Sequence, residues 1–239
     1  MNHIIGVSGG KDSTALALRL NEVEPRDYTY LCTPTGNEPD DMRAHWDHLE
    51  TLLGPIVRLQ TQTLEDLIEE QQCLPSHRMR WCTRRLKIEP TLAYLRAHAP
   101  ATLYVGLRAD EETRGGIYGD DAQYDFPFRR WGWAEADVLD YLHHRGITIP
   151  ARTDCEWCYD QTLGEWRALW RNNPESWARA VAWEAKTGHT FRSSQRDTQP
   201  APLAFLGTKF ASGFIPRGDT DQLSLFDAPE LRKCRICTL

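Results

Sequence analysis

A glycine-rich stretch near the amino terminus carries residue types that bind anions. It reads Ser8-Gly9-Gly10-Lys11-Asp12-Ser13-Thr14, after the apolar run Ile4–Val7 and before the apolar-periodic segment Ala15–Leu20. This order predicts a strand, a turn and a helix. Glycines let the backbone approach a ligand closely, and the amides that begin a helix favour an anion. With the hydroxyls and the Lys11 ammonium as further donors, the stretch predicts a phosphate site.

A second group of cations lies in residues 73–90, beside Cys73 and Cys82. Its basic side chains are His77, Arg78, Arg80, Arg84, Arg85 and Lys87. In a chain of net charge −6, such local basicity indicates another anion site, since guanidinium groups suit phosphate and sulfate. The alternative is the solvated start of a helix.

The cysteines indicate metal or redox chemistry. The chain has seven, and two pairs have C-x-x-C spacing, at Cys155–Cys158 and Cys234–Cys237. These four thiolates could hold Zn²⁺. Alternatively, Cys73 and Cys82 could join Cys155 and Cys158 around a [4Fe–4S] cluster. Spacing does not name the metal, and free buried thiols are a further alternative. Cys32, in a predicted strand, reads as a small buried hydrophobe.

The elements that would position these residues alternate between strands and helices. Strands are predicted at residues 3–7, 27–32, 55–59 and 101–106, and helices at 13–24, 39–53, 63–72 and 134–145. The pattern predicts an α/β fold with an open, mostly parallel sheet. Thr35, Gly36 and Glu38 follow the second strand, at the sheet edge where such folds bind ligands.

Residues 1–150 are therefore expected to form a nucleotide-binding α/β domain. Residues 151–192 read as a subdomain rich in Cys and Trp, with helices at 163–171 and 174–186 whose tryptophans pack in a core. Residues 193–239 read as an irregular tail, because residues 193–220 show no periodicity.

The composition and charge of the chain indicate an ordinary globular protein. The 239 residues are 41% hydrophobic and 26% charged, which is typical of globular proteins. With a net charge of −6, the chain lacks the overall excess of basic residues that would indicate a nucleic-acid-binding protein. No apolar run reaches membrane-spanning length, and the first strand begins where a signal peptide would lie. A cytoplasmic protein without a membrane partner is expected.

The glycine-rich stretch is not a Walker A loop, which has four residues between its first glycine and Gly-Lys-Ser/Thr. It resembles the SGGxDS loop of the PP-loop ATP-pyrophosphatase superfamily. Three later segments resemble the phosphoadenosine phosphosulfate (PAPS) reductase-like family within it: a T-G-x-E segment, a C-x4-K-x2-P stretch and a G-x-R loop. The matching residues are Thr35, Gly36, Glu38, Cys82, Lys87, Pro90, Gly106, Arg108 and Arg114.

The resemblance implies an enzyme that binds ATP at Ser8–Ser13 and cleaves it to AMP and pyrophosphate. Mg²⁺ would bridge the phosphates, with Asp12 helping to hold it. Lys11, Arg84 and Arg108 would stabilise the charge on the leaving pyrophosphate. An adenylated acceptor would then receive sulfur, and both a sulfur donor protein and a nucleic-acid acceptor fit this scheme.

The resemblance also favours the cluster over zinc. Adenosine phosphosulfate (APS) reductases ligate a [4Fe–4S] cluster with a tandem cysteine pair near the Cys82 position and a later C-x-x-C. Here Trp81 takes the place of the tandem partner, and Cys73 is the nearest replacement. The spacing is also similar to that of the ATP-pyrophosphatase component of DNA phosphorothioation.

Two other functions are carried as alternatives. A PAPS or APS reductase would use a tail cysteine, Cys234 or Cys237, and release sulfite. Such reductases have a loop without the lysine and end in an E-C-G-x-H-like motif, which is absent here. The third reading is a non-catalytic adaptor that senses nucleotide or cluster.

The tail holds one peptide motif. Residues Gln222–Phe226 resemble the Q-L-S/D-L-F peptide that docks on bacterial sliding clamps. The alternative is a terminal segment that folds onto its own domain.

Overall fold

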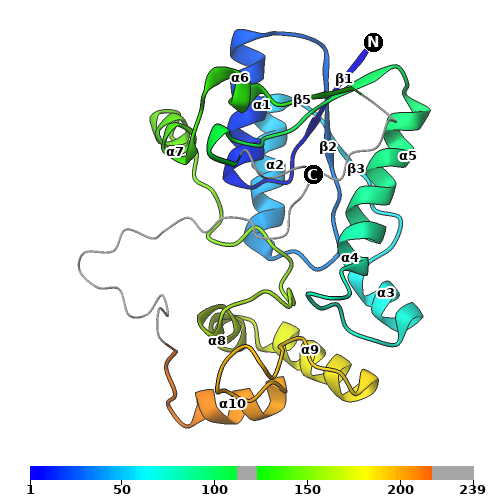
Figure 1. The fold of residues 1–239 in the computed structure, drawn as a ribbon. Helices are drawn as coiled ribbons and strands as arrows, with labels where there is room; N and C mark the ends of the chain where they lie inside the picture. Colours follow the sequence, from blue (N-terminus) through cyan, green and yellow to red (C-terminus); the bar gives the residue numbers. More distant parts are fainter. Residues whose placement is uncertain (112–122, 217–239) are drawn as a thin grey trace.

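The computed structural model describes residues 1–111 and 123–216. Its centre is a five-stranded sheet of order β3-β2-β1-β4-β5, in which every neighbouring pair is parallel. The strands are β1 (Asn2–Gly6), β2 (Tyr28–Cys32), β3 (Ile56–Arg58), β4 (Ala101–Tyr104) and β5 (Gln123–Asp125). The predicted α/β fold with a parallel sheet is confirmed (Figure 1).

Helices cover both faces of this sheet because both faces are apolar. Ile5 of β1 packs in a core with α1 (Lys11–Val23), α2 (Asp40–Leu53) and α7 (Glu135–His144). Its neighbour Ile4 points the other way, into a core with α5 (Glu89–Ala97). The alternation follows from the two-residue period of a strand. The short helix α6 (Pro127–Trp131) and the 3₁₀ turn η2 (Ala109–Glu111) complete the sheet-bearing part.

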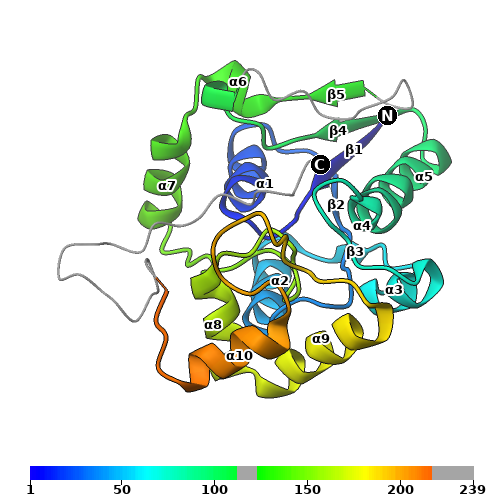
Figure 2. The ribbon, with the colours of Figure 1, turned by 60° about the horizontal axis from the view of Figure 1, so that its bottom comes forward.

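A second core lies below the sheet and is built from aromatic side chains. It joins α3 (Leu64–Gln71) to α8 (Leu163–Asn172), α9 (Pro174–Thr187) and α10 (Leu203–Ala211), which lie together in Figure 2. Its large buried side chains are Trp157, Trp166, Trp177, Phe191 and Phe210. The expectation that Trp166 and Trp177 pack in a core is confirmed.

Local sequence explains where several helices start. Thr63 and Thr162 precede α3 and α8, and each hydroxyl accepts the N–H of the third helical residue, at 3.1 and 3.3 Å. In turn, the side-chain carboxylates of Asp66 and Glu165 accept the backbone N–H groups of Thr63 and Thr162, which completes a capping box at each helix.

The predicted strands and helices lie within two residues of those observed, but one expectation is wrong. Residues 193–220 were expected to be irregular, and α10 lies among them. It has nine residues, most of them apolar, so the helical spacing of its buried Leu203, Leu206 and Phe210 does not stand out from the apolar residues beside them. Burial against the aromatic core stabilises this helix. Among the described helices, none is both long and apolar enough to cross a membrane.

Candidate functional site

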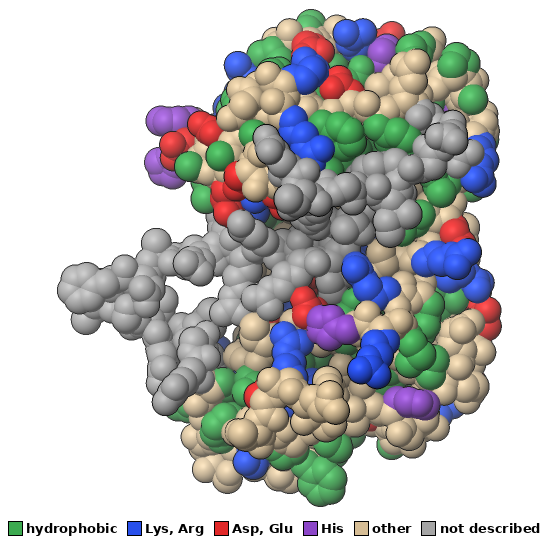
Figure 3. Space-filling model, viewed as in Figure 1, with side chains coloured by type: hydrophobic (Ala, Val, Ile, Leu, Met, Phe, Trp, Pro, Cys, Tyr) green, Lys and Arg blue, Asp and Glu red, His purple; other side chains and the backbone are tan. Residues whose placement is uncertain are grey.

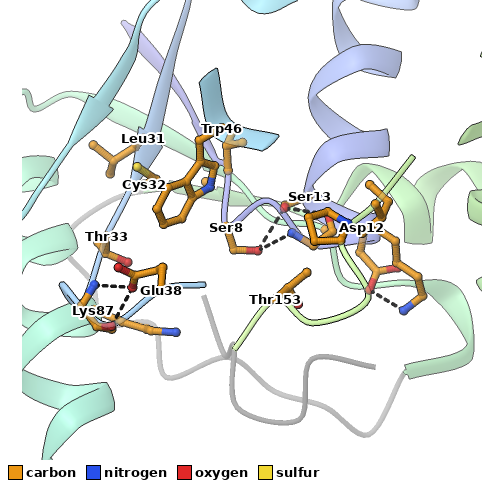
Figure 4. Close-up of a pocket in the computed structure, with 18 of the residues that line it drawn as sticks. Ser8, Asp12, Ser13, Leu31, Cys32, Thr33, Glu38, Trp46, Lys87 and Thr153 are labelled. Carbon is orange, nitrogen blue, oxygen red and sulfur yellow. Dashed lines mark hydrogen bonds and ion pairs between the residues drawn. The ribbon is translucent and has the colours of Figure 1, made fainter. Parts of the chain in front are cut away.

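The main pocket lies at the carboxyl ends of β1, β2 and β4 (Figure 4). The strand order reverses between β1 and β4, and open α/β sheets bind ligands at such a switch point. The residues predicted from the sequence that line it are Ser8, Gly10, Lys11, Asp12, Ser13, Thr35, Glu38, Lys87 and Gly106. Nine predicted residues from four separate segments thus meet in one place.

The glycine-rich loop is packed tightly against α2. Gly9 has φ +83°, and a Cβ there would lie 1.9 Å from the Met42 methyl carbon and 2.8 Å from the Trp46 indole nitrogen. Glycine is therefore required at this position. Behind the loop, His45 is buried, and this burial lowers its pKa to about 4, so the imidazole is neutral at pH 7.

The loop ends where α1 begins, at Lys11, so the positive end of the helix dipole faces the pocket. Ser8 Oγ and Ser13 Oγ lie 3.0 Å apart, and Ser13 Oγ donates to the Gly10 carbonyl at 3.1 Å. In Figure 4 these hydroxyls and Asp12 lie across the pocket from Glu38 and Lys87. The arrangement can bind a phosphate chain through backbone and hydroxyl donors.

Ion pairs hold the charged residues of the loop. The Lys11 ammonium lies 3.3 Å from Asp12 and 3.3 Å from Glu135, at the start of α7. Arg108 Nη1 lies 3.0 Å from both carboxylate oxygens of Asp12, and Arg108 Nε lies 2.9 Å from Asp110. Arg108 is fully buried. The structure therefore places Arg108 behind the loop, where it orients Asp12.

Glu38 organises the loop that follows β2. Its carboxylate accepts the Thr35 hydroxyl at 2.6 Å, the Thr35 N–H and, at 3.0 Å, the Gly36 N–H. Gly36 has φ +76°, and a Cβ there would lie 2.7 Å from the Thr63 methyl group. These bonds fix Thr35 at the pocket.

The basic side chains of residues 73–90 differ in whether they line the pocket. Its helix runs from α4 (Trp81–Thr83) through a π-helical turn, η1 (Arg84–Ile88), into α5. Lys87 in this turn lines the pocket. π-helical turns are rare in proteins overall, but those that occur are often found at functional sites. Arg84 lies outside the pocket lining, is exposed, and pairs with Glu89 at 2.9 Å. Figure 3 shows further Lys and Arg side chains between the sheet-bearing part and the lower helices.

A second, largely apolar pocket adjoins the first and contains three of the four cysteines predicted to bind a cluster. Cys82, Cys155 and Cys158 line it with Leu64, Trp157 and Tyr159. Thr35, Lys87 and Cys155 line both pockets. We call them the nucleotide pocket and the cysteine pocket.

The thiols of the cysteine pocket are shielded from water. A hydrogen bond with Cys155 and burial raise the pKa of Cys158 well above its usual value. Burial, with Cys155 nearby, raises the pKa of Cys82 to about 11. Without a metal the thiols of Cys82 and Cys158 are protonated at neutral pH, because burial disfavours the thiolate. A bound metal ion would reverse that preference.

Several predicted residues are not brought together. Cys73 does not line the cysteine pocket, and within residues 1–111 and 123–216 no three or more His, Cys, Asp or Glu side chains are arranged to hold a metal ion. Arg114, Cys234, Cys237 and the Gln222–Phe226 motif lie outside the described residues. Cys32 is buried, as expected, and its thiol lines the nucleotide pocket.

Sequence reasoning missed other residues of the site. Trp46 and Thr153 line the nucleotide pocket, and Glu135 binds Lys11. Asn37, inside the T-G-x-E segment, contacts the segment between Cys155 and Cys158. Asn37 lies within the run Gly36–Glu38, which the sequence places at the nucleotide site, but nothing in the sequence predicts its contact with the cysteine turn. No local pattern marks the other three.

Comparisons with known proteins bear on the family and the fold. Residues 2–117 match the family model described as the phosphoadenosine phosphosulfate reductase domain. Among solved structures, the chain is similar to the phosphoadenylyl-sulfate (PAPS) reductase from Candida auris, solved as a phosphate complex. The TM-score is 0.51 at 12% identity, over 62% of this chain and 75% of that chain. At that identity the likeness shows a shared fold. No curated protein matches the chain.

Proposed function

Residues 2–117 of this chain belong to the phosphoadenosine phosphosulfate reductase domain family of the PP-loop superfamily, and from this premise we propose that the protein cleaves ATP to AMP and pyrophosphate. The family membership predicted from the sequence is thus confirmed. The observation that carries the proposal is the intact loop, whose Ser8, Lys11, Asp12 and Ser13 all line the pocket at the start of α1.

In the proposed reaction an acceptor oxygen attacks the α-phosphorus of ATP. The bond to the bridging oxygen of the β-phosphate breaks, and pyrophosphate leaves with the electron pair. The loop donors and the Lys11 ammonium would stabilise this charge, because fixed donors act strongly where charge develops. Lys11 would leave Glu135 for the phosphates, while Arg108 keeps Asp12 in place.

Mg²⁺ would neutralise part of the phosphate charge when bound. Asp12 and Glu111 are the carboxylates of the pocket lining that could hold it, together with Glu38 at the opposite wall. All three carboxylates already have partners, Glu38 in its own loop and Asp12 and Glu111 with Arg108, so Mg²⁺ would share or displace these contacts.

We also propose that the cysteine pocket holds a metal cofactor, a [4Fe–4S] cluster or Zn²⁺. Cys82, Cys155 and Cys158 line this apolar pocket and would supply three sulfur donors, although their side chains would first have to turn toward a common centre. The fourth donor would be Cys73 or one of Cys234 and Cys237. Anaerobic purification with iron, sulfide and zinc analysis tests this proposal. An absence of all three would defeat it.

The adenylated acceptor would then receive sulfur, which the adjoining thiols favour. Cys155 lines both pockets, so a thiol lies beside the proposed site of adenylation. A sulfur donor protein and a nucleic-acid acceptor remain proposed partners, as does a sliding clamp through Gln222–Phe226. Assays of AMP release with DNA, tRNA or sulfonucleotides would identify the acceptor.

A second candidate is a sulfonucleotide reductase that binds PAPS or APS in the same pocket. The family model and the fold likeness both carry the name of such a reductase. A cysteine thiolate would attack the sulfur of the sulfonucleotide, form a thiosulfonate and expel the adenosine phosphate. Cys155, in the pocket lining, or the terminal pair Cys234 and Cys237 would act as the nucleophile.

One experiment separates these functions. The purified protein is incubated with ATP and Mg²⁺, and in parallel with PAPS or APS and a thiol reductant. AMP and pyrophosphate from ATP support the first proposal. Thiosulfonate or sulfite without ATP cleavage would overturn it in favour of the reductase. Tight nucleotide binding without turnover in every arm would support the non-catalytic adaptor.

A further inference from the structure

The two residues between Cys155 and Cys158 are both held by one asparagine of the sheet-bearing domain. The backbone N–H of Glu156 donates to the Asn37 carbonyl at 2.7 Å. The backbone N–H of Trp157 donates to the Asn37 side-chain oxygen, Oδ1, at 3.0 Å. Asn37 is buried. One residue thus satisfies both N–H groups in the middle of the cysteine turn.

The same turn is anchored on its other side to the start of α9. The Glu156 carboxylate accepts the Asn173 side-chain amide at 2.9 Å and the Ser176 hydroxyl. The indole N–H of Trp157 donates to Ser176 Oγ at 2.8 Å, and Trp157 is fully buried. The turn therefore lies between Asn37 and α9, and each side has its own hydrogen bonds.

Asn37 also connects to the nucleotide pocket. Its backbone N–H donates to Thr35 Oγ1 at 3.3 Å, and Glu38 holds that same hydroxyl. Thr35 lines both pockets, and so does Cys155. A single path of hydrogen bonds thus runs from the wall of the nucleotide pocket to the segment that carries the cysteines.

We infer that Asn37 is a positioning residue that couples the two pockets: it holds Cys155 at the nucleotide pocket, so that a bound nucleotide restrains the cysteine turn. The inference rests on the proposed function insofar as it places a nucleotide in the first pocket. The Trp157 N–H requires a hydrogen-bond acceptor on a side chain as long as that of asparagine. Aspartate keeps it, whereas alanine leaves the buried Trp157 N–H unpaired.

The test is iodoacetamide labelling of Cys155 and Cys158, read by peptide mass spectrometry on the full chain, both as purified and after a chelator has removed any bound metal. The ligand is α,β-methylene-ATP with Mg²⁺, which the proposed cleavage cannot hydrolyse. The variants are Asn37→Ala and Asn37→Asp. Asn172→Ala is the matched control, since Asn172 is exposed at the end of α8.

In the unsubstituted protein we expect the nucleotide to slow labelling of both cysteines. Asn37→Ala should label about fivefold to tenfold faster and lose most of the nucleotide effect, as expected when one buried hydrogen bond is lost. Asn37→Asp should restore both properties, and Asn172→Ala should change neither. If Asn37→Ala does not fold, Asn37→Ser replaces it, because its hydroxyl is too short to reach the Trp157 N–H.

Wild-type labelling and protection in Asn37→Ala, or failure of Asn37→Asp to restore them, would overturn the inference. Failure of the proposed function gives a different result. In that case calorimetry would show no binding of α,β-methylene-ATP to the unsubstituted protein. Binding that is normal in all variants, with loss of cysteine protection in Asn37→Ala alone, separates coupling from nucleotide binding itself.

Discussion

The nucleotide pocket and the cysteine pocket adjoin, yet they are built in opposite ways. The first is lined by both polar and apolar side chains, and its charged and hydroxyl groups come mainly from one contiguous segment, Ser8–Ser13, which follows β1. The second is apolar and combines Cys82 of α4 with a turn about 70 residues later. A local motif can recur as a unit, whereas a site assembled from distant segments depends on the packing between them.

The largest expected effect is on the metal content of variants in which a cysteine is replaced. We expect Cys82→Ser and Cys155→Ser to remove bound iron or zinc, because both thiols line the cysteine pocket. Cys73→Ser should retain it, because Cys73 lies outside that lining. Elemental analysis of the purified variants provides the measurement. Metal loss in Cys73→Ser equal to that in Cys82→Ser would restore Cys73 as the fourth ligand.

Removal of the buried Arg108 guanidinium behind the glycine-rich loop should cost the most stability. Arg108→Met removes the cation that Asp12 and Asp110 share, and because both carboxylates are partly exposed and Asp12 keeps Lys11, we expect a cost of about 1–3 kcal/mol. Urea denaturation measures this cost. Arg84→Ala is the control, since its exposed pair with Glu89 contributes less than about 1 kcal/mol. Equal stability of the two variants would contradict the assigned role of Arg108.

The loop lysine should affect activity more than stability. Lys11→Ala removes a cation from the pocket lining, and loss of one charge-stabilising donor lowers kcat by about 10²–10³-fold. The assay follows pyrophosphate release. Unchanged turnover would move the active site elsewhere, and Arg84→Ala serves again as the variant expected to keep full activity.

The smallest expected effect is a dependence of stability on pH. It comes from Glu184, in the aromatic core that supports the cysteine pocket. Glu184 of α9 is buried and accepts the backbone N–H groups of Phe191, at 3.0 Å, and Leu203, at 2.6 Å. Burial raises its pKa to about 7, despite these bonds. The folded protein therefore binds this proton more tightly than the unfolded chain does.

Stability from this group should consequently fall as the pH rises from about 4.5 to about 7, by about 2–3 kcal/mol at most. Denaturant unfolding across that range measures the slope. Glu184→Gln should flatten the slope, although it loses one hydrogen bond. An unaltered slope would assign the pH dependence to other groups.

The sequence predicted much of the nucleotide pocket because its residues follow strands directly. Ser8–Ser13, Thr35 with Glu38, and Gly106 each come just after β1, β2 and β4, and parallel strands bring their carboxyl ends to one edge. The contact of Glu135 with Lys11 has no such signal, because it depends on how α7 packs against α1. The same holds for α10, a short and mostly apolar helix whose burial against α8 and α9 depends on tertiary packing.

By itself, the sequence determined the family, the parallel α/β fold and the anion-binding loop, since these depend on residue types at short spacing. The tertiary structure decided which partners the charged residues take. It placed Arg108 on Asp12, turned Arg84 to solvent and put Cys155 between the two pockets. It also brought Asn37 to the cysteine turn. Burial and hydrogen bonding between distant segments determine these contacts, and no local pattern encodes them.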